Sequence, residues 1–235
     1  QSIDIGTNGG LIIPGFYSLS NSLNPLLPPA EADAKSEVDG VFAGATLTYR
    51  KFLILDGTLR RDQSSTLPEG NNAYFYPSVS GGFVCSELLP SLTWLSYGKL
   101  RANYATVGHD APVYATRDTY TIGSPFNGQA TAYPSTTKAN QNLLPEKNES
   151  YEFGIEANFL KNRLGFDVTY YHARTYNQIL AVQISNASGF SSKFLNAGTM
   201  QNQGVEVSFN ATPVKTENFS WDITVNYTKN VSKVI

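Results

Sequence analysis

The residues with the most reactive side chains are few and stand apart from one another. His109 is followed by Asp110, His172 lies more than sixty residues further on, and Cys85 is the single cysteine of the 235-residue chain. Nucleophilic catalysis needs a serine or cysteine beside a histidine, and no GxSxG-type elbow accompanies either histidine. We interpret all three as structural residues and do not expect the chain to be an enzyme.

Paired carboxylates are the second candidate for chemistry, because glycoside hydrolysis places two carboxyl groups across one bond. Glu152 and Glu156 would share one face of a strand, but four residues at ~3.3 Å each put them about 13 Å apart. Both courses of glycoside hydrolysis use shorter separations, of about 5 to 9.5 Å. The sequence also lacks metal-ligand clusters, a Walker-type loop, a Rossmann glycine pattern and an EF-hand. We therefore expect no cofactor and no metal.

The composition is poor in charge and rich in uncharged polar and aromatic residues. Charged residues make up 15 % of the chain, 17 Lys or Arg against 19 Asp or Glu, with 14 Tyr and 13 Phe. Soluble domains usually carry about 25 % charged residues. The net charge of −2 gives no electrostatic footprint for nucleic acid. No stretch approaches the 18 apolar residues of a transmembrane helix.

Apolar residues recur with a period of two, which predicts β-strands rather than helices. The segment from Phe219 to Thr228 alternates most cleanly, and its apolar face has aromatic residues at both ends. The expected strands are residues 41–49, 52–62, 74–84, 97–107, 151–159, 164–171, 204–211 and 219–228, with weaker extended segments at 12–20 and 178–184. Residues 24–37, which include three prolines, are expected to form a loop.

The links between these strands alternate in length. Short links at 50–51, 161–162 and 213–218, and a somewhat longer one near 85–95, alternate with long polar links at 63–73, 108–149 and 175–203. Transmembrane β-barrels have short turns on one side, long loops on the other, and aromatic girdles at both interfaces. Their strands survive in hydrocarbon because closure satisfies every backbone hydrogen bond.

The pattern predicts an all-β protein with an antiparallel transmembrane β-barrel, here a partial barrel of about 8–10 strands. Two alternatives remain open at this point. One is a soluble extracellular β-sandwich that acts as a carbohydrate-binding module, since sandwich strands alternate as well. The other is a glycan-active β enzyme. Carboxylates on the polar side of the strands favour a barrel with a wet lumen.

Short sequence blocks occur in a fixed order over most of residues 41–235. They are Thr58–Ser65, Tyr76–Gly81, Leu143–Gly154, Lys161–Gly165, Ser188–Lys193 with Asn196–Gly198, Asn202–Glu206, and Phe219–Asp222 through to Asn230. Together these blocks resemble the SusC/RagA family of TonB-dependent outer-membrane transporters. The first 40 residues match the family less distinctly.

The resemblance implies a domain organisation and a location. Residues 1–40 would hold a weak strand and an extracellular loop, and residues 41–235 would be barrel strands in the outer membrane of a Gram-negative bacterium. Barrels of this type have about 22 strands around a plugged lumen. The chain also ends on Ile235 rather than on a terminal aromatic residue. We therefore expect an internal fragment, without the plug and the C-terminal strands.

The resemblance also implies a function and partners. It predicts TonB-dependent import of oligomeric nutrients, glycans or peptides, together with a SusD-like surface lipoprotein. The other expected partners are the TonB complex, reached through the plug, the oligosaccharide or peptide substrate, and outer-membrane lipid, with no nucleic acid.

Two groups of residues are candidates for the site. The charged residues expected to face the lumen are Asp56, Arg60, Asp62, Lys99, Arg101, Glu152, Glu156, Asp167, Glu206 and Asp222. The loop aromatics that could contact substrate or a lid are Tyr114, Tyr120, Phe126, Tyr133 and Phe190. Arg60 and Asp62 lie on one side of a strand and are interpreted as a network that braces the wall against the plug, with a substrate or loop-anchoring contact as the alternative.

Overall fold

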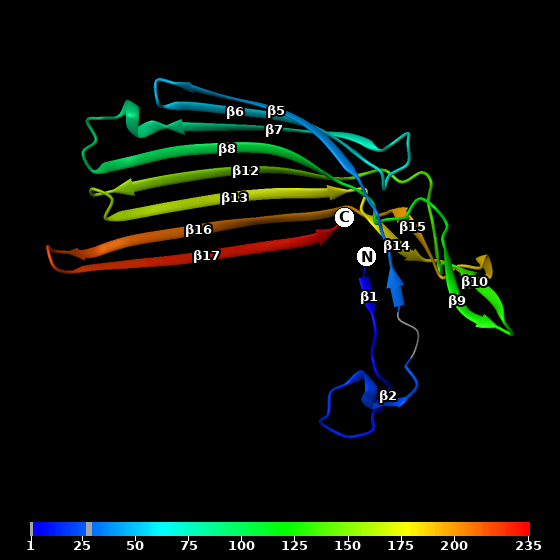
Figure 1. Cartoon of the computed structure of the whole chain (residues 1–235). Coiled ribbons are helices and arrows are strands. Elements are labelled where there is room, and N and C mark those ends of the chain that lie inside the picture. The colour runs from blue at the N-terminus through cyan, green and yellow to red at the C-terminus, as the bar shows by residue number, and fades with distance from the viewer. Residues whose placement is uncertain (1, 27–29) are drawn as a thin grey trace. The chain divides into compact units, whose positions relative to one another are not determined.

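The computed structural model describes residues 2–26 and 30–235, in two compact units that divide after Ser36 (Figure 1). The first unit holds two short antiparallel pairs and a 3-10 helix. Its elements are β1 (Ser2–Asp4) with β4 (Ala30–Ala32), β2 (Asn8–Leu11) with β3 (Ser22–Asn24), and η1 (Leu19–Asn21).

The expected weak strand at residues 12–20 is wrong. The buried side chain of Asn21 accepts a hydrogen bond from the Ile13 amide at 3.1 Å and donates to the carbonyls of Ile13 and Phe16 at 2.9 and 2.7 Å. Gly15 has φ +84°, which a continuous strand does not allow. The chain therefore turns here instead of extending. Of the loop expected at 24–37, residues 27–29 lie outside the described residues, and residues 30–32 form β4.

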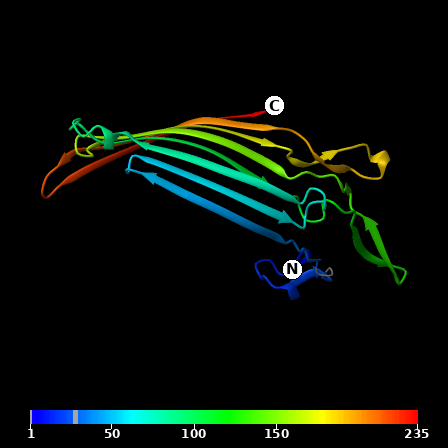
Figure 2. The same cartoon turned by 90° about the horizontal axis from the view of Figure 1, so that it is seen from above.

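The second unit is built on one eight-stranded antiparallel sheet, which confirms the eight expected strands. Each strand is 12 to 16 residues long and pairs with its neighbours in chain order. The strands are β5 (Val38–Tyr49), β6 (Leu53–Ser64), β7 (Ala73–Val84), β8 (Leu95–His109), β12 (Glu146–Phe159), β13 (Leu164–Tyr176), β16 (Met200–Lys215) and β17 (Ser220–Val234). We call this sheet the strand wall; Figure 2 shows that it is curved rather than flat.

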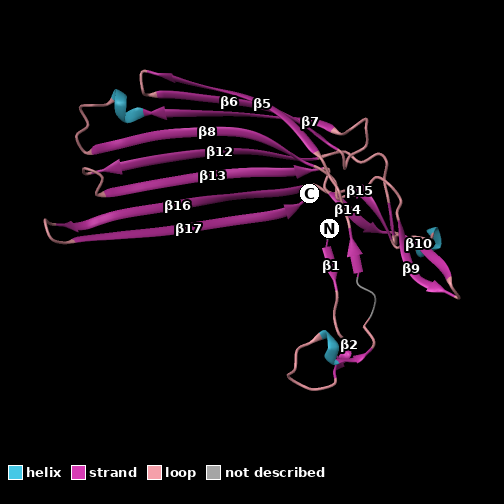
Figure 3. Ribbon diagram, in the orientation of Figure 1, coloured by secondary structure: helices cyan, strands magenta, loops and turns pink. Residues whose placement is uncertain are grey.

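The links of the strand wall are short at one end and long at the other (Figure 3). The shortest is the three-residue link at 50–52, in which Arg50 and Lys51 have φ values of +44° and +63°, positive as in a type I′ turn. The link at the same end between β7 and β8 contains the 3-10 helix η2 (Cys85–Leu88). Among the described residues, no helix combines the length and the apolar composition that a membrane span requires.

The long links contain strands that the sequence analysis missed. A hairpin of β9 (Tyr120–Phe126) and β10 (Gln129–Pro134) lies in one link. A three-stranded sheet joins the two longest links through β11 (Thr137–Lys138), β15 (Ser192–Asn196) and β14 (Ile179–Gln183), the last of which was expected at 178–184. The 3-10 helix η3 (Asn186–Ser188) precedes β15.

A small hydrophobic core lies among these long links rather than on the strand wall. It consists of the buried residues Leu67, Ala111, Ala115 and Leu143, and Tyr74, Ile179 and Phe194 are packed against it. We call this cluster the loop core. Three links that are distant in sequence are thereby held together at one end of the wall.

Candidate functional site

The pairing register sorts the side chains of the strand wall onto two faces. Glu156 is opposite both Lys99 and Asp167, and Asp167 is opposite Ser208, so these residues share one face. Following the same register and the alternation along each strand places all ten charged candidates on this face, which we call the polar face: Asp56, Arg60, Asp62, Lys99, Arg101, Glu152, Glu156, Asp167, Glu206 and Asp222.

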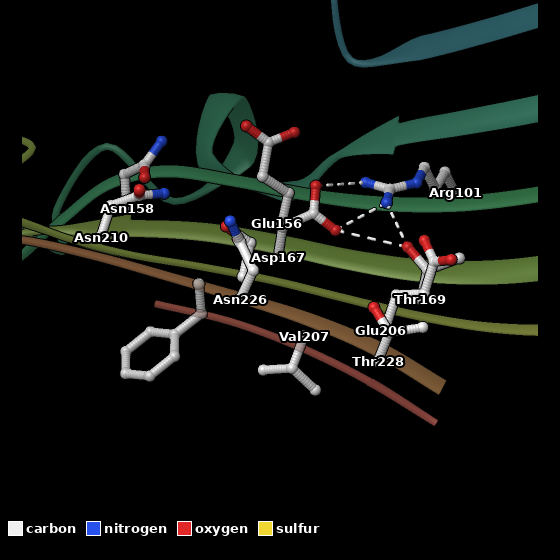
Figure 4. Close-up of a pocket in the computed structure, with 12 residues that line it drawn as sticks. Arg101, Glu156, Asn158, Asp167, Thr169, Glu206, Val207, Asn210, Asn226 and Thr228 are labelled. Atoms are coloured by element: carbon white, nitrogen blue, oxygen red, sulfur yellow. Dashed lines mark hydrogen bonds and ion pairs between the residues drawn. The ribbon is translucent and has the colours of Figure 1, made fainter. Parts of the chain in front are cut away.

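The strongest interaction on the polar face joins β8 to β13 across β12. The Arg101 guanidinium donates to both carboxylate oxygens of Asp167, at 2.6 and 3.1 Å, and to the Thr169 hydroxyl at 2.5 Å (Figure 4). Between these strands the backbone of Gly154 lies beneath the guanidinium, so that a Cβ at this position would collide with Arg101. The glycine therefore lets one arginine reach over a whole strand to its carboxylate.

Other carboxylates of the polar face accept hydrogen bonds from neighbouring side chains. Glu152 accepts from the Asn103 amide at 3.0 Å, and Asp56 accepts from the Ser80 hydroxyl at 3.3 Å. Asp62 is buried and accepts from Arg60 at 2.8 Å and from the Tyr76 hydroxyl. Asp222 accepts from Thr212 and Ser220 at 2.6 and 3.1 Å. Arg60 and Asp62 are thus bonded within the wall, and their expected role in bracing the wall against the plug stays a prediction.

A hollow of about 490 Å³ lies on the polar face over β8, β12, β13, β16 and β17. Figure 4 shows Arg101, Glu156 and Asp167 on the side of the hollow and Val207 pointing the opposite way. The carboxylates of Glu156 and Glu206, which line it, have no hydrogen-bond or ion-pair partner among the described residues. The hollow is therefore a polar surface with a net excess of unpaired negative charge.

The opposite face, which we call the apolar face, is exposed. Ile155 is 57 % exposed, although Leu100 and Val168 flank it in register on the two neighbouring strands. In a water-soluble protein such a face would be covered, since exposed apolar patches above a few hundred Å² are rare. The apolar face therefore needs an apolar environment from outside the chain.

Aromatic rings border the apolar face in two rows. At the short-link end, Trp94 stacks on Phe159 with ring centroids 5.7 Å apart, and Phe166 contacts both Phe159 and Phe209. At the other end, Tyr151 stacks on His172 at 4.8 Å. Eight residues separate Phe159 from Tyr151, about 27 Å along a strand at ~3.4 Å per residue. At the tilt of about 35–45° that strands of membrane barrels adopt, this length spans roughly 19–22 Å across the membrane, close to their apolar band of about 25 Å.

Beyond the Tyr151 row the same face becomes polar. Glu149 is opposite Arg174, and its carboxylate pairs with Lys147 at 2.5 Å. Lys229, on strand β17 at the free edge of the described sheet, is an exception within the apolar band. The change from apolar to charged residues places the boundary of the band just outside the row of Tyr151.

The residues considered for catalysis are not arranged for it. Asp110 accepts from the Ser64 hydroxyl at 2.7 Å and lies 3.9 Å from the His109 ring nitrogen, so the acid and not the histidine is next to the serine. His172 is stacked on Tyr151 on the apolar face, and Cys85 lies in η2. In the part of the chain that the structure describes, no three metal-ligating side chains cluster.

The loop aromatics lie largely in the open. Tyr120, Phe126 and Tyr133 are on the exposed β9–β10 hairpin, and Tyr114 is half exposed, whereas Phe190 is partly covered by the Lys138 ammonium 5.0 Å above its ring. None of the five belongs to the loop core. The expected contact of these aromatic residues with substrate or a lid stays a prediction.

The sequence did not reveal which uncharged residues complete the polar face. Thr169, Asn103 and Tyr76 act as hydrogen-bond donors or acceptors to its charged groups. The sequence shows that these residues alternate with apolar residues, but their hydrogen-bond partners are up to 68 residues away in the sequence. The register between strands would have been needed to pair them.

Comparison with known proteins gives one consistent family. The family model described as "TonB dependent receptor-like, beta-barrel" matches residues 6–233. The TonB-dependent receptor P26 of Formosa agariphila is 30 % identical over 94 % of this chain and 23 % of its own length, and the TonB-dependent receptor SusC of Bacteroides thetaiotaomicron is 30 % identical over 75 % and 19 %.

A solved structure agrees with these relatives. The RagAB peptide transporter superposes with a TM-score of 0.82 at 26 % identity, over 94 % of this chain and 25 % of the other. The chain thus spans about a quarter or less of the length of the relatives that it matches.

Proposed function

The chain belongs to the TonB dependent receptor-like β-barrel family, and from this premise we propose that it is part of an importer of oligomeric nutrients. The strand wall is a section of an antiparallel outer-membrane barrel of a Gram-negative bacterium, and the resemblance to the SusC/RagA family is confirmed. The relatives are receptors and transporters, not enzymes.

One observation carries the proposal: the strand wall has an exposed apolar face and a hydrogen-bonded polar face on the same strands. A soluble β-sandwich would bury one of these faces against a second sheet. We infer that the apolar face meets lipid and that the polar face lines the lumen. The ten charged residues of the polar face would then contact the segment or solvent that fills the barrel.

The partners of the importer follow from its family. We propose that a SusD-like surface lipoprotein covers the barrel on the side of the long links, and that the TonB complex supplies energy through a plug. Tyr114, Tyr120, Phe126, Tyr133 and Phe190 lie in those links and would meet the lipoprotein or the substrate. The solved relative is named a peptide transporter, and for this chain we propose glycans or peptides.

Uptake by cells tests the proposal. Cells that carry the full-length protein should accumulate fluorescently labelled oligosaccharides or oligopeptides, and deletion of its gene or of tonB should abolish accumulation of one class. A catalytic product in the medium, or uptake unchanged by both deletions, would contradict an energised importer.

A further inference from the structure

A second hollow, of about 510 Å³, lies among the long links, away from the polar face. Its size falls within the range of about 300 to 1,000 Å³ that is usual for ligand pockets. Eight residues from two links line it, and we call it the loop pocket: Ser65, Leu67, Pro68, Glu69, Asn72, Thr116, Arg117 and Gln141.

The loop pocket rests on an ordered base. Leu67 is also part of the loop core, in which Ala115, the neighbour of Thr116, is completely buried. The Ser64 amide donates to the Asn72 carbonyl at 2.9 Å, and the Asn140 amide donates to the Ala115 carbonyl at 2.9 Å. The backbone on both sides of the pocket is therefore fixed before any ligand arrives, which lowers the entropic cost of binding.

Three polar side chains of the loop pocket are exposed and make no bond within the described chain, whereas the Ser65 hydroxyl accepts a hydrogen bond from the Glu37 amide at 2.9 Å. Among the described residues, those of Glu69, Arg117 and Gln141 have no hydrogen-bond or ion-pair partner. Polar groups next to the pocket behave differently, since Asp118 is bonded to Lys138 and Asp110 to Ser64. The Arg117 guanidinium, the Glu69 carboxylate and the side-chain amides of Asn72 and Gln141 line one hollow without pairing to any described residue, and they are therefore available to a ligand.

The chemistry of this lining selects one class of ligand. A guanidinium binds a carboxylate through two parallel hydrogen bonds, and a carboxylate binds an ammonium group. The side-chain amides of Asn72 and Gln141 each offer a donor and an acceptor, as a peptide group requires. The lining contains no aromatic ring on which the apolar face of a sugar could stack.

We propose that the loop pocket binds a short peptide with free termini. Arg117 takes the C-terminal carboxylate, Glu69 takes the N-terminal ammonium, and Asn72 and Gln141 bind the peptide groups between them. The proposal rests on the proposed import function, whose substrate class it narrows to peptides.

Calorimetric titration of the purified full-length protein in detergent tests the site, with the tripeptide Ala-Ala-Ala as the probe. Arg117→Gln and Glu69→Gln should each weaken binding about tenfold or more, because each removes a hydrogen bond between charged groups. The amidated peptide should bind weakly and be insensitive to Arg117→Gln, and the N-acetylated peptide should be insensitive to Glu69→Gln.

Matched controls and a sugar probe complete the test. Arg174→Gln and Glu217→Gln remove exposed charges elsewhere and should leave binding unchanged. Maltotriose should not compete with the tripeptide. Equal binding of free and capped peptides, competition by maltotriose, or no binding of the tripeptide to the wild-type protein would overturn the proposal.

The two proposals can fail separately. If labelled oligomers enter cells in a TonB-dependent way but Arg117→Gln has no effect on tripeptide binding, the loop pocket is refuted and the importer stands. If the tripeptide binds as described but neither deletion changes uptake, the importer is refuted and the pocket stands.

Discussion

Apolar residues are exposed on the strand wall and buried in the loop core. On the wall, Ile155 is 57 % exposed, whereas Leu143 in the loop core is completely buried. The loop core thus forms its own interior, as a soluble domain does, while the wall depends on its surroundings for the burial of its apolar face. The two regions are therefore expected to respond differently to the same kinds of substitution.

The largest effect is expected in the loop core. Leu143→Ala should lower the free energy of opening of the long links by about 2–5 kcal/mol, because it removes a buried side chain and leaves a cavity. Hydrogen exchange of the Ala115 and Asn140 amides measures this opening. Leu144→Ala, at a neighbouring exposed residue, should have little effect. Equal exchange in both variants would show that the loop core is not a cooperative unit.

Introducing a charged residue on the strand wall should lower stability more on the apolar face than on the polar face. Ile155→Arg lies midway between the two aromatic rows and should cost about 2–4 kcal/mol in lipid vesicles, the penalty for an arginine at the bilayer midplane. Ser208→Arg, on the polar face, should cost less than about 1 kcal/mol because it can remain hydrated. Urea unfolding of the full-length protein in vesicles provides the measurement. Equal losses would contradict the assignment of the faces.

Breaking the main ion pair of the polar face should lower the free energy of unfolding by a smaller amount. Arg101→Gln removes the bidentate contact with Asp167, but both side chains are about a third exposed, at 32 % and 36 %. Solvent screening limits the expected loss to about 1 kcal/mol in the same unfolding experiment. Lys99→Gln, without such a partner, should change stability less, and a larger loss in that variant would contradict a stabilising role for the Arg101–Asp167 pair.

The smallest effect concerns pH in the long links. The hydrogen bond from Lys138, with a second from the Ala139 amide at 3.1 Å, lowers the pKa of Asp118 below its ordinary value. The folded link is therefore favoured at pH above the unfolded pKa, and this contribution is lost as the pH falls through the lowered pKa. Protection of the Ala139 amide, taken as its exchange rate relative to the intrinsic rate at the same pH, should fall at acidic pH in the wild type. In Asp118→Asn this loss of protection should be absent, and a loss of protection at high pH instead would contradict the sign.

The sequence predicted the wall better than the links for a physical reason. The two faces of each strand meet different environments, so apolar and polar residues alternate with a period of two, as from Phe153 to Phe159. The links have no such constraint. Pairing of Thr137 with Ser192 and of Lys138 with Lys193 joins segments 55 residues apart, and the loop core depends on contacts of the same kind.

The same limit applies to the polar face. Membership of the ten charged residues in one face follows from alternation, but the contact of Arg101 with Asp167 needs three strands in register and a glycine between them. The loop pocket was not foreseen at all, because two links that are separate in sequence form it. The alternation along each strand therefore predicts which face a residue lies on. Which residues come together in a site follows only from the assembled structure.

The central claim is that the apolar face of the wall meets lipid and the polar face does not. In full-length protein with Cys85→Ser, single cysteines placed at each position from Ser150 to Ala157 and labelled with a nitroxide report their environment through relaxation by oxygen and by a water-soluble nickel chelate. Labels at the four odd positions should be accessible to oxygen and protected from nickel, and labels at the even positions should not show this lipid signature. Equal nickel accessibility on both faces, or no period of two, would contradict a membrane-spanning wall.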